Sequence, residues 1–432
     1  MNYPETVNYL LTRLPMYSRI GAAAYKADLT NTIELCEALD NPQLRFKSIH
    51  IAGTNGKGSV SHMLAAILQC AGYRTGLYTS PHLHDFRERI RVDGEMIAED
   101  FVTGFVEYIK PQVDRLDPSF FEITVGMAFD YFANQEVDIA VIETGLGGRL
   151  DSTNVIIPEL SVITNIGFDH MNLLGDTLDK IAMEKAGIIK KGVPVVVGEY
   201  HEGSGPVFVR KAREQKSTIF FADRERLATN WSFDGPDLTV EVTLNHTDQK
   251  DYYTLDLGGL YQAKNLLTVL HAVHLLREQG WKIPPAAVHE ALRKVRHITG
   301  LHGRWEKIHE SPLVICDVAH NPDGFRQIVK QLEVTTFHHL HIVLGMVKDK
   351  DISTVLSLLP AHARYYFAQA DIPRALPSAD LKEAATGYGL EGDAYPDVNA
   401  ALKSALSVAH KDDLVLVCGS VFLVGEVDRE RL

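Results

Sequence analysis

The fold is decided by the stretch Ile49-His50-Ile51-Ala52-Gly53-Thr54-Asn55-Gly56-Lys57-Gly58-Ser59, in which an apolar run opens directly into a glycine-rich loop. An amphipathic segment, Val60 to Cys70, follows at once. A strand, a glycine-rich loop and a helix in this order form a phosphate-binding site, because backbone N–H groups converge on anionic oxygens and a lysine reaches the outer phosphates. An ordinary strand-to-helix turn is the alternative, and Lys57 favours a nucleotide phosphate.

The spacing of this loop departs from the standard P-loop pattern. Counting back from Gly56-Lys57, the first glycine of G-x-x-x-x-G-K would stand at position 51, where the chain has Ile51. The glycine comes two residues later, as Gly53, and Gly58 separates the lysine from the hydroxyl of Ser59. The loop therefore predicts nucleotide binding without indicating a kinase or a GTPase.

Length and composition predict a globular protein of two domains. The 432 residues exceed the roughly 250–300 at which a single core stops growing, and 45% of them are hydrophobic and 23% charged. With 43 basic and 56 acidic residues the net charge is −13, which argues against a general binder of nucleic acids or membrane surfaces.

The same features predict a cytoplasmic protein. The four cysteines, Cys36, Cys70, Cys316 and Cys418, lie far apart without C-x-x-C spacing, which indicates free thiols in a reducing compartment. The N-terminal residues lack the basic and apolar regions of a signal peptide, and no apolar run approaches the roughly 18 residues of a membrane span.

Strand-like and helix-like segments alternate through the first half, which predicts a parallel α/β sheet covered on both faces. The expected strands are 46–52, 75–79, 138–143, 160–166 and 193–197, and the expected helices are 59–71, 98–116, 122–134 and 177–189. Short alternating strands at 217–221, 238–244 and 252–255 then predict a small antiparallel extension of this domain.

Two further helices, 262–279 and 285–295, lead to Gly300-Leu301-His302-Gly303-Arg304, whose glycines suggest a hinge. After it the α/β alternation resumes, with strands expected at 313–316, 340–344, 365–368 and 414–417 and helices at 324–332, 353–358, 378–386 and 398–409. We therefore predict a P-loop parallel-sheet ATPase domain over residues 1–298 and a smaller Rossmann-like α/β domain over residues 299–432.

Polar residues follow three successive predicted strands of the first domain, at the edge where open α/β sheets bind ligands. Ser80, Glu143 and His170 each come just after a strand and share this edge with Lys57. A hydroxyl and a carboxylate beside a phosphate loop suit Mg²⁺, which prefers oxygen ligands. His170 fits magnesium less well, and a hydrogen-bonded loop histidine is the alternative.

Further candidates have two interpretations each. Lys185 lies in the run Met183-Glu184-Lys185-Ala186-Gly187. It forms either a solvated ion pair with Glu184 or, after carbamylation by CO₂, an anionic metal ligand. Asp317 and His320 follow a predicted strand and could contact ATP or position an amine, while Asn321 and Pro322 are typical of a helix N-terminus. Arg304 is a surface charge or an arginine that the hinge brings against phosphate.

Seven motifs in order, spread over nearly the whole chain, resemble those of the folylpolyglutamate synthase/dihydrofolate synthase enzymes of the Mur ligase family. Besides the glycine-rich loop they are Tyr78-Thr79-Ser80-Pro81-His82, Glu143-Thr144-Gly145-Leu146-Gly147-Gly148-Arg149-Leu150-Asp151, Asp169-His170, Glu184-Lys185-Ala186-Gly187-Ile188, His302-Gly303-Arg304-Trp305 and Asp317-Val318-Ala319-His320-Asn321-Pro322. The displaced glycine of the loop is then a family trait.

The resemblance implies ATP-dependent amide ligation, in which a pteroate or folate carboxylate forms an acyl phosphate that the amine of L-glutamate displaces. Two anions must approach one another, so Lys57 and Mg²⁺ must neutralise charge, and water must be excluded. The implied partners are small molecules (dihydropteroate, tetrahydrofolates, L-glutamate, ATP), with no nucleic acid and no membrane, and we expect a monomer.

Residue roles implied by the resemblance cover the whole candidate site. They are Thr54, Asn55, Gly56, Lys57, Gly58, Ser59, Asn265, Arg304 and Asp317 for ATP; Ser80, Glu143 and His170 for Mg²⁺; a carbamylated Lys185; His320 for catalysis; and Phe121, Asp151 and Ser152 for the pterin-bearing substrate.

Other functions fit the sequence less well. A monofunctional folylpolyglutamate synthase is the nearest alternative. A peptidoglycan-type Mur ligase would usually carry a further N-terminal domain, whereas about 45 residues precede the loop strand here. A nucleotide switch would not need Asp317 and His320, and a scaffold protein would leave the polar strand ends unexplained.

Overall fold

The computed structural model describes residues 1–16, 21, 28–245, 247 and 249–431. It divides into two compact units. The first unit holds Met1–Gly167, Met171–Asp256 and Gln262–Leu301, and the second holds Phe168–His170, Leu257–Tyr261 and His302–Leu432. Two short segments of the earlier sequence are therefore grouped with the second unit.

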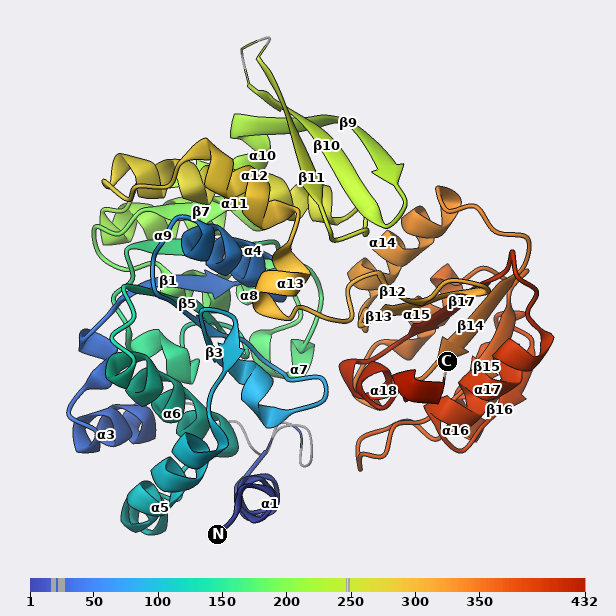
Figure 1. Cartoon of the computed structure of the whole chain (residues 1–432), viewed down its shortest axis with the longest axis horizontal. Helices are drawn as coiled ribbons and strands as arrows, with labels where there is room; N and C mark the ends of the chain where they lie inside the picture. Colours follow the sequence, from blue (N-terminus) through green and yellow to red (C-terminus); the bar gives the residue numbers. More distant parts are fainter. Residues whose placement is uncertain (17–20, 22–27, 246, 248, 432) are drawn as a thin grey trace. The chain divides into compact units, whose positions relative to one another are not determined.

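The first unit is built on an eight-stranded sheet in the order β4-β3-β2-β5-β1-β6-β7-β8 (Figure 1). Its strands are β1 (Lys47–Ala52), β2 (Thr75–Tyr78), β3 (Ile90–Val92), β4 (Glu95–Met96), β5 (Ile139–Glu143), β6 (Leu160–Ile163), β7 (Val195–Val197) and β8 (Ile219–Phe221). β1 pairs in parallel with β5 and with β6, whereas β3 pairs antiparallel with both of its neighbours, β2 and β4. The chain order reverses beside β1, which is the position where open α/β sheets place their ligands.

Helices cover both faces of this sheet (Figure 1). They are α1 (Tyr3–Arg13), α3 (Thr30–Ala38), α4 (Lys57–Cys70), α5 (Glu99–Leu116), α6 (Phe120–Asn134), α7 (Met171–Leu174), α8 (Leu178–Lys185), α9 (Gly205–Gln215), α10 (Ala222–Glu225), α11 (Gln262–Glu278), α12 (Pro285–Leu292) and α13 (Val295–Thr299), with 3-10 turns η2 (Pro42–Leu44), η3 (Phe86–Arg89), η4 (Ser152–Val155) and η5 (Ala186–Ile188). α6 packs with alternate side chains of β2 and β5, namely Tyr78, Ala140 and Ile142. α4 contacts β1, β2, β5, α11 and α12, which explains why nearly all of its residues are buried.

A three-stranded antiparallel sheet, β11-β10-β9, extends the first unit as predicted. It consists of β9 (Arg226–Asp234), β10 (Asp237–Leu244) and β11 (Lys250–Leu255). The prediction was wrong for 217–221, because Ile219–Phe221 forms β8 and pairs in parallel with β7 at the edge of the large sheet. The sequence pattern after Val197 did not predict α9, which lies between β7 and β8. This helix makes the crossover connection that two parallel neighbouring strands require.

The second unit is a six-stranded sheet in the order β12-β13-β17-β14-β15-β16. Its elements are β12 (Glu306–His309), β13 (Leu313–Asp317), α14 (Pro322–Glu333), β14 (Leu340–Leu344), α15 (Ile352–Leu358), β15 (Arg364–Phe367), α16 (Ser378–Thr386), β16 (Gly392–Ala394), α17 (Val398–Val408), β17 (Leu414–Cys418), α18 (Val421–Gly425) and η6 (Arg429–Arg431). All neighbours pair in parallel except β12 with β13. The α/β fold predicted from the sequence is confirmed.

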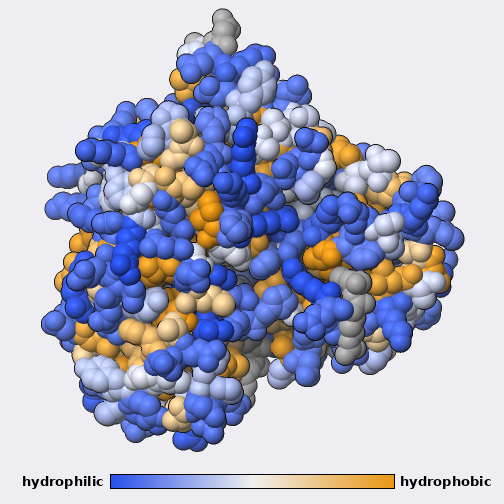
Figure 2. Space-filling view, in the orientation of Figure 1, coloured by the Kyte–Doolittle hydropathy of each residue, from blue (hydrophilic) through white to orange (hydrophobic). Residues whose placement is uncertain are grey.

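The surface drawn in Figure 2 is mainly hydrophilic, with apolar residues in scattered patches. Among the described residues, no helix is both long enough and apolar enough to cross a membrane. The four cysteines are free thiols, and Cys36, Cys316 and Cys418 are buried.

Candidate active site

The glycine-rich loop joins β1 to α4 and is tightly enclosed. Gly53 has φ +151° and Gly56 has φ +84°, in the region that disfavours residues with a side chain. A Cβ at Gly53 would lie 1.9 Å from Thr164 Oγ1, and one at Gly56 would lie 2.4 Å from Asn265 Oδ1. Lys57 Nζ donates to the carbonyl oxygens of Gly53, at 3.2 Å, and Thr54, at 3.3 Å, so its ammonium lies over the loop.

Residues that follow β6 hold this loop in place. The Thr54 N–H donates to Asn165 O, and the Asn55 N–H donates to Asn165 Oδ1, both at 2.9 Å. Thr164 Oγ1 donates to Asn55 O at 2.6 Å, and the Gly167 N–H donates to Thr54 Oγ1 at 3.0 Å. The backbone of the loop is thereby fixed before any ligand binds.

Side chains of α11 contact the beginning of α4. Gln262 Nε2 donates to Ser59 Oγ at 3.1 Å, and Asn265 Nδ2 donates to Gln262 Oε1 at 2.8 Å. Gly58 and Ser59 lie buried in the first turn of α4. Asn265 is therefore beside the loop, as required of a nucleotide contact, and Gln262 was missed although it stands three residues earlier on the same helix.

Lys185, at the end of α8, is not the solvated residue of the simpler interpretation. It is 4% exposed, and its Nζ donates to Gly53 O at 2.8 Å. Glu184 instead forms an ion pair with Arg149 at 2.9 Å. The structure thus brings Lys185 directly beneath the glycine-rich loop.

Ser80 and Glu143 lie side by side at the ends of β2 and β5. The Ser80 N–H donates to Glu143 Oε2 at 3.2 Å, and Glu143 is 4% exposed. His170, the third predicted metal ligand, belongs to the second unit. Among the described residues there is no group of three or more His, Cys, Asp or Glu side chains that could hold a metal ion.

The residues predicted to hold the pterin-bearing substrate lie around the loop that follows β5. The Phe121 ring packs against Gly145, where an added Cβ would approach its Cζ to 2.5 Å. Asp151 is 3% exposed and accepts hydrogen bonds from the N–H groups of Leu146, at 2.8 Å, and Thr153, at 3.0 Å. Burial raises the pKa of Asp151, although these hydrogen bonds oppose the rise. Ser152 is buried beside it.

In the second unit, Asp317 ends β13 and is held by three donors. It accepts from Tyr261 Oη at 2.7 Å, from the Trp305 N–H at 2.8 Å and from the Ala319 N–H at 2.9 Å. Burial raises the pKa of Asp317, and the hydrogen bonds lower it. The Arg304 guanidinium donates to the carbonyl oxygens of His302 and Gly303 and stabilises the charged form of Asp317 electrostatically.

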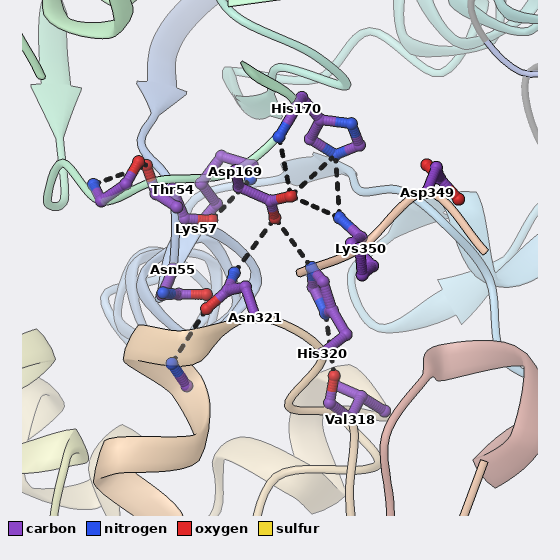
Figure 3. Close-up of polar contacts among 12 residues, drawn as sticks. Thr54, Asn55, Lys57, Asp169, His170, Val318, His320, Asn321, Asp349 and Lys350 are labelled. Carbon is purple, nitrogen blue, oxygen red and sulfur yellow. Dashed lines mark hydrogen bonds and ion pairs between the residues drawn. The ribbon is translucent and has the colours of Figure 1, made fainter. Parts of the chain in front are cut away.

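Asp169 is the centre of a polar cluster in the second unit (Figure 3). Its Oδ2 lies 3.1 Å from His320 Nε2 and accepts from Asn321 Nδ2 at 3.0 Å, and its Oδ1 pairs with Lys350. Burial alone would raise the pKa of Asp169, but these partners hold it well below its usual value. Asp169 stands next to His170, whose N–H donates to Asp169 Oδ1 at 2.8 Å.

Other predictions for this region hold, and one residue was missed. Asn321 Oδ1 accepts from the Gly324 N–H at 2.9 Å and Pro322 begins α14, so the predicted helix cap is confirmed. Lys350 was missed, although the run Lys348-Asp349-Lys350 follows a predicted strand as the other polar clusters do. This lysine-rich loop directly after a predicted strand is the sequence feature that could have indicated Lys350 as a site residue.

Comparison with known protein families identifies the family of this chain. Residues 51–273 match the model of the Mur ligase middle domain, and residues 303–421 match that of the Mur ligase glutamate ligase domain. The chain belongs to the Mur ligase family. The resemblance seen in the sequence is therefore confirmed.

Several relatives match this chain over almost their whole length. The dihydrofolate synthase/folylpolyglutamate synthase of Bacillus subtilis is 34% identical, over 94% of this chain and 95% of the relative. A folylpolyglutamate synthase structure from Thermotoga maritima is 33% identical with a TM-score of 0.81, over 100% of this chain and 96% of that chain. The Escherichia coli protein FolC, solved in complex with DHPP and ADP, is 29% identical with a TM-score of 0.83, over 98% and 96%.

Proposed function

We propose that this chain is an ATP-dependent ligase that joins L-glutamate to dihydropteroate, which makes dihydrofolate, and then joins further glutamates to folates. The observation that carries the proposal is the pairing of a phosphate-type loop, with Lys57 over it, with a glutamate ligase domain in one chain. The names of relatives that span nearly the full chain point to the same two substrates.

The reaction requires two anions to meet. The substrate carboxylate attacks the γ-phosphorus of ATP, ADP leaves, and an acyl phosphate forms; the glutamate amine then attacks the acyl carbon, releases phosphate and loses a proton. We assign the ATP phosphates to residues 54–59 and the rest of the nucleotide to Asn265, Arg304 and Asp317. Lys57 and the N-terminus of α4 supply positive charge against the phosphates.

We assign Mg²⁺ to Ser80, Glu143 and His170. The donors fit in kind, since Ser80 and the buried Glu143 are adjacent oxygen ligands at the sheet edge that carries the loop. Bound there, Mg²⁺ would neutralise charge that develops on the transferring phosphoryl group. Phe121, Asp151 and Ser152 are assigned to the pterin-bearing substrate, and His320 to the active-site groups that the second domain contributes.

We also propose that Lys185 is carbamylated. A neutral lysine amine adds to CO₂ and loses a proton, which gives an anionic carbamate that retains one N–H. That N–H can keep the hydrogen bond to Gly53 O, and the carbamate oxygens are ligands of the type that Mg²⁺ prefers. Mass spectrometry of the peptide that contains Lys185, after chemical trapping of the carbamate, should show the added carboxyl group. An unmodified Lys185 in active enzyme would refute the carbamylation.

The domains divide this work. We assign the ATP phosphates, the metal and the pterin to residues 1–298. We assign the glutamate ligase part to residues 299–432, which also supply Arg304 and Asp317 to the nucleotide site. We also propose that the enzyme acts as a monomer in the cytoplasm, where ATP and glutamate are available; light scattering with and without ATP checks the first point.

One experiment tests the proposed function. Purified protein with ATP, Mg²⁺ and glutamate is assayed for phosphate release with dihydropteroate, with tetrahydrofolate and with neither. We expect release with either pterin and only background without one. Release with tetrahydrofolate alone would make the enzyme a monofunctional folylpolyglutamate synthase, and release that needs no pterin would refute the ligase proposal in favour of a nucleotide switch.

A further inference from the structure

The loop between β2 and β3 satisfies nearly all of its charges internally. Glu88 accepts hydrogen bonds from the N–H groups of Leu83, His84 and Asp85, at 2.7 to 3.0 Å. Arg87 pairs with Asp85 at 2.8 Å and with Glu99 at 3.2 Å. Each of these charged side chains is therefore paired with an opposite charge or with backbone N–H groups.

Arg89 is the exception in this loop. It is 4% exposed, and in the part of the chain that the structure describes it has no carboxylate within the 4.0 Å of an ion pair. Its Nε donates to His82 Nδ1 at 2.7 Å, and its guanidinium lies 5.1 Å from the centre of the Phe120 ring. Since a buried cation that lacks a paired carboxylate is costly, an anion bound beside this guanidinium would stabilise it.

The histidine next to Arg89 does not supply the missing charge. Because Arg89 Nε donates to His82 Nδ1, this ring nitrogen carries no proton and the imidazole is neutral. A neutral ring can accept the Nε–H, as the 2.7 Å contact requires, but it offers no negative charge. Among the described residues, Arg89 therefore has no direct ion pair, although Glu88 and Glu143 stabilise its charge from a greater distance.

The position of Arg89 indicates which anion it awaits. The Thr79 N–H donates to Arg89 O at 3.0 Å, which places this residue beside the end of β2 and next to Ser80. Tyr78, on the same strand, is buried, and its ring lies 6.2 Å from that of Phe121. Arg89 also interacts electrostatically with Tyr78, Glu88 and Glu143, which stabilise its charged form. It therefore adjoins both the proposed pterin contacts and the proposed metal ligands.

We propose that Arg89 binds the carboxylate of the pterin-bearing substrate, the group that ATP phosphorylates. This inference rests on the proposed function. Arginine presents parallel N–H donors that match both oxygens of a carboxylate, and the pair is strong where water is excluded. Arg89 would thus neutralise the nucleophile and orient it between Phe121 and Glu143.

The test compares two ligands that differ only in charge. Binding of pteroate and of pteroic acid carboxamide is measured by titration calorimetry with ADP and Mg²⁺ present, for the wild type and for Arg89→Gln and Arg89→Lys. We expect the wild type to prefer pteroate by about tenfold or more, since an ion pair in a dry site is lost with the amide. Arg89→Gln should reduce this preference to less than about twofold, and Arg89→Lys should restore part of it.

Arg87→Gln is the matched control, because it removes an arginine of the same loop whose charge is already paired. It should leave the preference for pteroate unchanged. A second readout is Tm: the free Arg89→Gln protein should keep the wild-type Tm, because no internal ion pair is lost. Equal loss of affinity for both ligands in Arg89→Gln would overturn the inference, whereas a wild type that binds neither ligand would instead overturn the proposed function.

Discussion

Single buried carboxylates of the candidate site are oriented by backbone N–H groups. Asp151 and Asp317 each accept two such hydrogen bonds, and Glu143 accepts one from Ser80. Backbone donors are fixed by the fold, so each carboxylate keeps its position without a ligand. Each of these carboxylates is therefore held in place by the backbone of its own unit.

Lys57 is expected to be essential for phosphate release. Lys57→Ala should abolish phosphate release, by about a hundredfold or more, because it removes the charge that neutralises the transferring phosphate. Lys57 contacts only backbone carbonyl oxygens, so Tm should change little. Steady-state phosphate release and thermal unfolding check both points, and an active Lys57→Ala enzyme would remove the phosphate assignment.

Gly53 gives a second prediction, with the opposite pattern of effects. Gly53→Ala should lower both activity and Tm, because its Cβ would lie 1.9 Å from Thr164 Oγ1 at a φ of +151°. Combining it with Thr164→Ser does not remove the clash with Oγ1, whereas Thr164→Ala does. We expect the double variant Gly53→Ala/Thr164→Ala to recover part of the lost Tm. The double variant Gly53→Ala/Thr164→Ser should recover none. Gly53→Ala with wild-type Tm would show that the loop is not tightly enclosed.

Among the elements, β11 and α13 are joined through Asp256. Its Oδ2 accepts from the Arg296 N–H at 2.8 Å, in the first turn of α13. Burial raises the pKa of Asp256 to about 6, against about 3.9 in an unfolded chain. The folded state therefore binds this proton more tightly, and the contribution of Asp256 to the free energy of unfolding rises as pH falls from about 6 to about 4.

This gives a prediction for pH dependence. Asp256→Asn should flatten the profile of unfolding free energy between pH 4 and 6 relative to the wild type, because the titrating group is gone. Urea unfolding at several pH values in this range measures it. Asp251→Asn, an exposed aspartate of β11, is the control and should leave the wild-type slope. An unchanged slope in Asp256→Asn would contradict the raised pKa.

Sequence patterns predicted the elements whose apolar residues are consecutive or strictly periodic. The strand 340–344 and the helix 378–386 occur as predicted, since both are long buried or amphipathic runs. β4, β12 and β16 were missed because they are short edge strands, β3 because it has only three residues, and β9 because it is largely exposed. Such strands form through pairing with a neighbour that local sequence does not reveal.

The candidate site was predictable to the extent that its residues follow strands. This rule located Ser80, Glu143 and Asp317, and the burial of Lys185 agrees with the resemblance and not with its local pattern. Asp169, Gln262 and Lys350 were missed as site residues, because their importance lies in hydrogen bonds to residues 150 or more positions away. Periodicity carries no information on such pairs.

For the whole molecule, the C-terminal segment is tied to the beginning of the second unit by a buried ion pair. Arg429 donates to both oxygens of Glu306, at 2.7 and 2.9 Å, and Glu306 is 5% exposed. Burial alone would raise the pKa of Glu306, but His302, Arg429 and the Gly303 N–H lower it well below its usual value. This stabilisation is present above about pH 4.3 and is lost as pH falls towards the folded pKa.

Arg429→Ala should therefore destabilise the second unit by about 2 kcal/mol at pH 7, since it leaves a buried carboxylate short of its partner. The loss should shrink at acidic pH, where Glu306 is protonated. Unfolding followed by hydrogen exchange assigns the effect to a unit. Lys307→Ala, which removes an exposed pair with Glu310 at 3.2 Å, should cost less than about 0.5 kcal/mol. Equal effects of the two variants would contradict the importance of the buried pair.

The grouping of Phe168–His170 and Leu257–Tyr261 with the second unit limits how this enzyme can recombine with its relatives. A crossover between Leu301 and His302 would combine Asp169 and Tyr261 from one parent with His320, Lys350 and Asp317 from the other. Hybrids are viable only when both parents carry compatible residues at these positions. An exchange of residues 302–432 between relatives therefore requires that the two short stretches 168–170 and 257–261 are exchanged with them.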